Sequence, residues 1–433
     1  MSRVRRILVI GSTAALLLLV GGVVGLRSST PDSAAPAPAA PPDRLAAGIA
    51  QLQDRLRLVP GDYVGWAALG SAYVERARVT ADPTYYPKAE GALRRSIALR
   101  PSGNAAAHTG LGALANARHD FGAARGYALD ALRLNPYDAD AYGVLADAQT
   151  QLGNADAASE AVQHMLDLRP GLAALARASY DHEQRGRTAE AVALMSGALD
   201  AAVDRSDVAF CRYQLGELAF ATGDLAGAGR EYAAGLAADP AYLPLRAGRA
   251  RVAAAQGRLD AAIADLGATV QAMPTPTALL EYAELLRVAG RGAEADTQVE
   301  LAAAAQQLFD ANGGTDDLTG AALALAQGRP ADALALAERE WQRRQFADVA
   351  DTMAWALHAN GRDTEALSYA RRAAALGAAN ARYAYHLGTI ELALGDRAAA
   401  RRDLARALDI NPYFSLVDGP LAARTLAGLE SSS

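Results

Sequence analysis

The sequence predicts an all-α fold, an α-solenoid superhelix of about ten 34-residue helical hairpins preceded by a single transmembrane helix. Hydrophobic residues make up 51% of the 433 residues but aromatic residues only 6%, and alanine is the commonest type, which favours packed helices over strands. A second observation is a glycine followed five residues later by alanine and, twelve residues after that, by proline. The pattern is complete in four copies: Gly153, Ala158, Pro170; Gly223, Ala228, Pro240; Gly257, Ala262, Pro274; and Gly395, Ala400, Pro412.

The N-terminus carries the features of a membrane anchor. After a cytoplasmic stub (residues 1–6) with Arg3, Arg5 and Arg6, residues 7–26 form an uncharged apolar run of twenty residues. At about 1.5 Å per residue this run can cross a hydrocarbon core of about 30 Å. The arginines on its N-terminal side predict a cytoplasmic N-terminus and a single-pass topology that places the rest of the chain outside the cytoplasm.

A cleaved signal peptide is the alternative interpretation. Small residues between positions 34 and 40 offer cleavage sites, and cleavage would release a secreted protein. Because twenty residues exceed the usual ~7–15-residue apolar core of a signal peptide, we favour the uncleaved anchor. Residues 27–42 are rich in proline, alanine and serine and are predicted to form a linker.

Each repeated residue has a role in a helical hairpin. The glycine permits a short turn between two antiparallel helices, small residues let the helices approach closely, and the proline ends the second helix. Capping helices are expected at 43–58, before the first copy, and at 416–429, after the last. A breaker at 312–314 divides the array into an N-terminal block (43–314) and a C-terminal block (315–433).

The 34-residue period with this pattern resembles the tetratricopeptide repeat family. Trp66, Leu69, Gly70 and Tyr73 in the first copy match the opening signature of that family, and the resemblance extends over about residues 43–415. The chain is similar to a bacterial member that carries an N-terminal signal-anchor. The resemblance implies a stacked array that serves as a scaffold for protein–protein interaction.

Charge and motifs exclude several other classes of protein. The net charge of −6 is spread along the chain, which argues against a nucleic-acid partner. The single cysteine, Cys211, excludes an internal disulfide and a site built from several cysteines. Common catalytic motifs such as HExxH, GxSxG, GxxxxGK and CxxC are absent from the sequence. We therefore expect no enzyme activity, no cofactor, no metal site and no small-molecule substrate.

Family resemblance also suggests where a partner binds. In such arrays the inner wall is lined by the first helix of each hairpin, at positions ten, six and three residues before the turn glycine. These positions carry most of the aromatic and charged candidates for a peptide groove. They are Tyr180, Glu183, Tyr213, Glu217, Phe220, Arg251, Glu284, Arg287, Trp355, His358 and Tyr385.

We call these eleven inner-wall residues the stripe, and two interpretations of it remain open. The aromatic residues either contact a peptide or fill gaps that alanine leaves between helices. On the first interpretation the protein is a membrane-tethered extracytoplasmic scaffold of the cell envelope that binds protein or peptide partners. The alternative is a secreted soluble binding or sensory protein released by signal-peptide cleavage.

Overall fold

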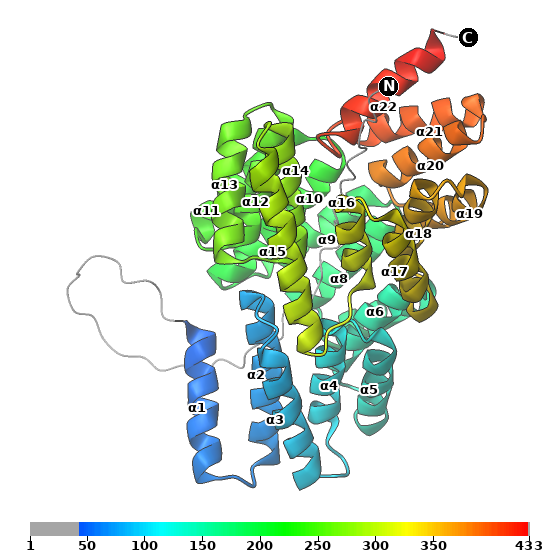
Figure 1. Cartoon of the computed structure of the whole chain (residues 1–433). Helices are drawn as coiled ribbons and strands as arrows, with labels where there is room; N and C mark the ends of the chain where they lie inside the picture. Colours follow the sequence, from blue (N-terminus) through cyan, green and yellow to red (C-terminus); the bar gives the residue numbers. More distant parts are fainter. Residues whose placement is uncertain (1–42, 432–433) are drawn as a thin grey trace, which may run out of the picture.

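The computed structural model describes residues 43–431 as 22 α-helices wound into a superhelix (Figure 1). All regular secondary structure in this range is helical, as the sequence predicts. Consecutive helices pack as ten antiparallel hairpins, and the first helices of neighbouring hairpins also contact one another along one side. That side is the inner wall of the superhelix, because closer spacing on one face is what makes a stack of hairpins curve.

The two sets of helices alternate along the chain. The first, inner helices are α2 (Tyr63–Thr80), α4 (Ala105–Ala117), α6 (Ala139–Leu152), α8 (Leu172–Gln184), α10 (Arg205–Ala221), α12 (Leu243–Ala255), α14 (Pro276–Val288), α16 (Asp317–Ala326), α18 (Ala347–Ala359) and α20 (Ala381–Ala393). The second, outer helices are α3 (Tyr85–Leu99), α5 (Phe121–Leu134), α7 (Ala155–Leu168), α9 (Thr188–Asp200), α11 (Leu225–Ala238), α13 (Leu259–Ala272), α15 (Gly292–Ala311), α17 (Pro330–Arg343), α19 (Asp363–Ala373) and α21 (Arg397–Ile410).

A single helix covers each end of the array, as predicted. Helix α1 (Arg44–Leu58) packs on α2, and the Asp43 side chain accepts a hydrogen bond from the backbone N–H of Ala46, which caps its first turn. Helix α22 (Asp418–Glu430) packs on α21. The exposed apolar faces of the terminal hairpins are thereby covered.

Two irregular copies differ from the others in helix length. In the first copy, residues beyond the 34-residue period lengthen α2 to 18 residues, and 81–84 connect it to α3. In the seventh copy α15 runs for 20 residues and ends at Ala311, just before the predicted breaker at 312–314. The division into blocks 43–314 and 315–433 stays a prediction.

Small residues allow large neighbours to pack deeply, as at Tyr232 of α11. This side chain is fully buried between two glycines of adjacent inner helices. A Cβ atom on Gly216 would lie 2.2 Å from the Tyr232 ring, and one on Gly248 would lie 2.6 Å from it. Glycine at these two positions is therefore required for the ring to fill the space between three helices.

The superhelix closes on itself along a line of contacts that we call the seam. Turns inside hairpins two to five (His119, Gly153, Gly186 and Gly223) meet the segments that follow hairpins seven to ten (312–316, 344–346, 374–380 and 411–417). The backbone N–H of Thr315 donates to the carbonyl of Arg118 at 3.0 Å. In Figure 1 the end of α15 accordingly reaches the level of α4.

Buried side chains reinforce the seam at its middle and far end. The Arg344 guanidinium hydrogen-bonds Gln151 and lies 4.9 Å from the centre of the Phe121 ring. Asn411, which is 2% exposed, donates from Nδ2 to the Phe220 carbonyl at 2.8 Å. The inner wall of the C-terminal hairpins is thus held opposite that of the central hairpins.

No helix between residues 43 and 431 is both long enough and apolar enough to span a bilayer. The predicted stub (1–6), anchor (7–26) and linker (27–42) lie outside the described residues.

Candidate functional site

The inner wall carries the predicted groove residues at different depths. Half-buried side chains, which keep part of their surface accessible, are Tyr180, Glu183, Tyr213, Phe220, Arg251, Arg287 and His358. Buried side chains are Glu217, Glu284, Trp355 and Tyr385. The accessible part of the stripe therefore lies mainly on α8, α10, α12 and α14.

Glu217 is the centre of a polar network between hairpins five and seven. Its carboxylate accepts two hydrogen bonds from the Arg251 guanidinium, at 2.9 and 2.6 Å, and a third from the Tyr232 hydroxyl at 2.6 Å. Nε of Arg251 also lies 3.4 Å from Glu281 Oε1. The structure thus joins Glu217 and Arg251, two residues that the sequence analysis placed on neighbouring units of one wall.

Aromatic rings flank this network. The Tyr213 ring lies 6.3 Å from the rings of both Tyr232 and Tyr242, and the Phe220 ring lies 5.4 Å from the Arg251 guanidinium. Each ring packs on one side against the core of hairpins five and six and remains partly accessible on the other. The two rings therefore fill gaps between helices, and part of each ring remains exposed on the inner wall.

Tyr180 and Glu183 of α8 face acidic groups across the inner wall. Burial raises the pKa of Glu183 to about 7, and the carboxylates of Glu217 on α10 and Asp348 on α18 add to the increase. The pKa of Tyr180 is also raised well above its usual value, first by burial and then by Asp348. Asp348 itself accepts a hydrogen bond from the Tyr383 hydroxyl. This part of the wall thus concentrates negative charge in a poorly solvated place.

Glu183→Gln should make stability less dependent on pH. Because the folded-state pKa of about 7 lies above the ordinary 4.5, the folded protein binds more protons between these values, and stability falls as pH rises through this window. We expect the variant to melt at a higher temperature than the wild type at pH 8, with a smaller difference at pH 5. The exposed Glu300→Gln is the control, and a difference between Glu183→Gln and wild type that stays constant with pH would contradict the assignment.

Trp355, His358 and Tyr385 form a separate aromatic cluster in the C-terminal hairpins. The Trp355 ring stacks between His386, at 3.9 Å, and His358, at 4.8 Å, while the Tyr385 ring lies 6.0 Å away. Nδ1 of His386 lies 2.8 Å from Asp351. Trp355 and Tyr385 belong to the buried core there, and of the three predicted residues only His358 is partly accessible.

The two predicted residues of α14 are held differently. Arg287 pairs with Asp296 of the outer helix α15 at 3.1 Å, so its charge is directed away from the wall. Glu284 is 8% exposed, and burial raises its pKa well above the usual value, followed by the effects of Asp418 and Glu281. Glu284 therefore stays on the wall among other carboxyl groups.

Three residues of the wall, Arg177, Asp348 and Asp418, lie outside the positions predicted from the sequence. Arg177 donates two hydrogen bonds to Asp147, at 2.9 and 2.8 Å, between hairpins three and four. Their separation of 30 residues was an available signal, because it is close to the repeat period. Asp348 and Asp418 had no such signal, since they reach the site only through closure of the seam.

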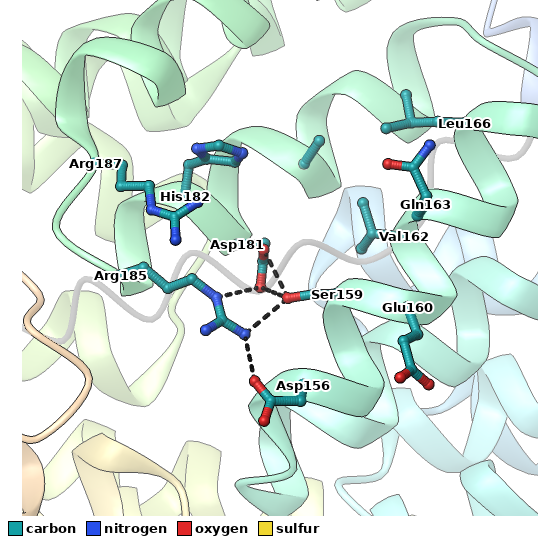
Figure 2. A pocket seen from close by; sticks show the side chains of 11 residues that line it. Asp156, Ser159, Glu160, Val162, Gln163, Leu166, Asp181, His182, Arg185 and Arg187 are labelled. Carbon is teal, nitrogen blue, oxygen red and sulfur yellow. Dashed lines mark hydrogen bonds and ion pairs between the residues drawn. The ribbon is translucent and has the colours of Figure 1, made fainter.

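A cavity of about 440 Å³ lies away from this wall, between α7 and α8. Figure 2 shows the Arg185 side chain reaching across it to Asp156 and Ser159, with Asp181 beside them. The Arg185 guanidinium donates to Ser159 at 2.8 Å, and Ser159 donates to Asp181 at 2.8 Å. The polar groups at the centre of the cavity thus bond one another.

Metal and thiol chemistry find little support in the described residues. Between residues 43 and 431 no group of three or more His, Cys, Asp or Glu side chains is placed to hold a metal ion. The adjacent residues Asp181, His182 and Glu183 do not share one site. Asp181 and His182 line the cavity between α7 and α8, whereas Glu183 belongs to the inner wall. Cys211 is fully buried, and burial raises the pKa of its thiol to about 12, which keeps it in the unreactive form.

Comparison with known proteins supports the repeat assignment at the C-terminal end. Residues 381–414, which form the tenth hairpin, match the family model described as a tetratricopeptide repeat. No curated protein matches the chain.

Three solved structures are among those similar to this chain. A tetratricopeptide repeat protein from Parabacteroides merdae is 16% identical, with a TM-score of 0.36 over 60% of this chain and 98% of its own. The APC/C hetero-tetramer Cut9-Hcn1 is 13% identical, with a TM-score of 0.34 over 89% and 94%. The P58(IPK) TPR domain is 16% identical, with a TM-score of 0.25 over 76% and 99%.

Folds of this kind are typically non-catalytic and suited to protein–protein interaction. Residues 381–414 thus match a tetratricopeptide repeat, and nine further helical hairpins precede this one in residues 43–431.

Proposed function

We propose that this protein is a membrane-tethered, extracytoplasmic scaffold that binds segments of partner proteins on its inner wall. The observation that carries the proposal is the accessible stripe on α8 and α10, where Tyr180, Tyr213 and Phe220 lie beside Glu183 and other charged groups. Aromatic anchors next to charges of both signs are typical of surfaces that bind peptides. The partner is a protein segment rather than a small molecule.

Photo-crosslinking tests where partners bind. A photo-reactive amino acid placed at position 180, on the inner wall, should form adducts with a partner protein in cells that produce the full chain. The same residue at position 137 is the control, because Tyr137 is 77% exposed in the segment between α5 and α6. Adducts from position 137 with none from position 180 would contradict the proposed binding surface.

The membrane location rests on the sequence of the N-terminal segment, where Arg3, Arg5 and Arg6 precede the apolar residues 7–26. A reporter enzyme that works only outside the cytoplasm should be active when fused after Ser433. An inactive fusion, with an active cytoplasmic reporter at the same position, would overturn export.

The intact mass of the N-terminus in purified membranes separates the anchored form from the secreted alternative, since cleavage near residues 34–40 removes the apolar run.

A further inference from the structure

One turn of the seam carries a histidine where the next three turns carry glycine. His119 lies between α4 and α5 and has a φ angle of 62°, whereas Gly153, Gly186 and Gly223 hold the corresponding place in hairpins three to five. Histidine is tolerated at such an angle but less readily than glycine, which has no Cβ atom. The turn geometry alone therefore does not favour histidine, and its ring is what distinguishes this turn from the others.

The imidazole ring of His119 is packed inside the seam. It stacks on Phe121 of α5, with the ring centres 5.5 Å apart, and lies 5.4 Å from the Phe309 ring of α15. Only 11% of the side chain is exposed. The adjacent Arg118 carbonyl accepts the hydrogen bond from the Thr315 backbone N–H, so the ring lies beside a bond that closes the seam.

The polar surroundings of the ring suit the neutral form of histidine. Nδ1 of His119 is buried and has no hydrogen-bond partner in residues 43–431. The Asp316 carboxylate lies 3.8 Å away, too far for a hydrogen bond, and both of its oxygens already accept hydrogen bonds from Thr319. A charged ring donates at both nitrogens, whereas a neutral ring can leave Nδ1 without a proton. Protonation would therefore place a charged donor at Nδ1 without an acceptor.

The charged groups that face the ring do not offset its burial. Asp316 and Glu340 favour a charged ring, whereas Arg344 and Arg343 disfavour it. The Glu340 carboxylate is already paired with both of these arginines. Burial therefore lowers the pKa of His119 below the ordinary 6.5, with Asp316 opposing this effect and Arg344 adding to it.

A second buried polar atom at this end of the seam belongs to Arg118. Its Nε has no hydrogen-bond partner in the part of the chain that the structure describes, while its Nη1 pairs with Glu90 of α3 at 2.7 Å. A guanidinium remains charged throughout the range in which histidine titrates. His119 is therefore the group at this contact whose charge changes near neutral pH.

We propose that His119 makes this end of the seam sensitive to pH, so that acidification opens the contact between hairpin two and residues 312–316. Opening brings the ring into water, where it is protonated below about pH 6.5, and the charged ring is then disfavoured between Phe121 and Phe309. The seam holds the inner walls of the central and C-terminal hairpins opposite each other. Opening it therefore widens access to the surface that binds partners in the proposed function, on which this regulatory role rests.

Hydrogen–deuterium exchange of the full-length chain, followed by mass spectrometry, tests the proposal. The Thr315 N–H is protected by its bond to Arg118, so exchange in residues 312–316 reports opening of this contact. After correction for the intrinsic effect of pH on amide exchange, opening should increase up to about tenfold from pH 7.5 to pH 5.5. Linkage gives this limit of about tenfold for a ring that stays neutral when buried and has a pKa of 6.5 in water.

The far end of the seam is the internal control. Residues 411–417 meet the turn of hairpin five through Asn411 and Phe220, and neither this segment nor residues 220–223 contain histidine. Corrected exchange in 411–417 should therefore stay constant between the two pH values.

His119→Asn removes the titrating ring and keeps a residue that tolerates the turn angle. We expect exchange in 312–316 to lose its pH dependence in this variant. His164→Asn, which changes an exposed histidine of α7, should retain it. The wild-type profile is a separate test if His119→Asn does not fold.

Three results would each overturn the proposal. The first is corrected exchange in 312–316 that changes less than about twofold or decreases at pH 5.5, because Asp316 would then hold the charged ring in place. The second is an equal increase at both ends of the seam, which would mean that the whole chain loosens. The third is a pH dependence that persists in His119→Asn. If position 180 crosslinks a partner while the seam does not respond to pH, the proposed function stands and only its regulation by His119 fails.

Discussion

Glu217→Ala should lower the free energy of unfolding by about 3–5 kcal/mol, the cost of removing one member of a buried, hydrogen-bonded ion pair. The change takes two hydrogen bonds from Arg251 and one from the Tyr232 hydroxyl. Tyr232 is fully buried, so its hydroxyl group has no access to bulk water as a replacement. Among residues 43–431, Arg251 then retains one paired carboxylate, that of Glu281 at 3.4 Å. Urea denaturation of both proteins measures the difference.

Asp265→Ala is the matched control, because it removes a carboxylate that accepts two hydrogen bonds from Arg249, at 2.7 and 2.6 Å, near the surface. The Arg249 side chain is 49% exposed, and exposed pairs contribute about 0–1 kcal/mol. If the two variants lose the same stability, the network around Glu217 is not the buried structural element described above.

Gly186→Ala should destabilise the protein more than the same change at Gly290. Both glycines have positive φ angles, 71° and 78°, for which alanine costs about 1–2 kcal/mol. A Cβ atom on Gly186 would also lie 2.2 Å from the carbonyl oxygen of Gly377, whereas one on Gly290 would meet nothing within 4 Å. Because the added Cβ atom forces the backbone at the seam to move, we expect Gly186→Ala to lower the free energy of unfolding by a further 1–3 kcal/mol or so, that is, by about the cost of overpacking.

Equilibrium denaturation of the two glycine variants measures this difference, and circular dichroism before denaturation checks that both keep their helices. Equal stabilities would mean that the turn of hairpin four does not touch the segment after hairpin nine. The comparison therefore tests closure of the superhelix separately from the conformation of the turns.

Much of the architecture could be predicted because the repeat pattern is local. Turn glycines such as Gly153 and Gly395 have φ angles of 83° and 84°, and His119, at the corresponding turn of the second hairpin, also has a positive φ, 62°. Each of these turns lies within its own 34-residue unit, where a single glycine or small residue decides how the two helices of the hairpin meet. Helix length was less predictable, since α2 absorbs the extra residues of the first copy by adding turns.

The candidate site was harder to predict because it depends on closure. The resemblance to the repeat family implies the stripe on α8 and α10, but its acidic partner Asp348 comes from α18 on the opposite wall. The buried positions of Trp355 and Tyr385 follow instead from packing between neighbouring hairpins, where the Trp355 ring stacks on His386. A pattern that repeats every 34 residues does not encode which distant units meet.

The seam changes how such a chain is expected to fold and unfold. An open repeat array is nearly one-dimensional, so its ends can fray without disturbing the middle. Here contacts such as Asn411 to Phe220 join residues 191 positions apart. Early hairpins must therefore persist during synthesis until the last ones arrive, and this closure slows folding through its loop entropy. Once the superhelix has closed, the tenth hairpin and the fifth stabilise each other. Unfolding of one of them therefore also removes contacts that hold the other.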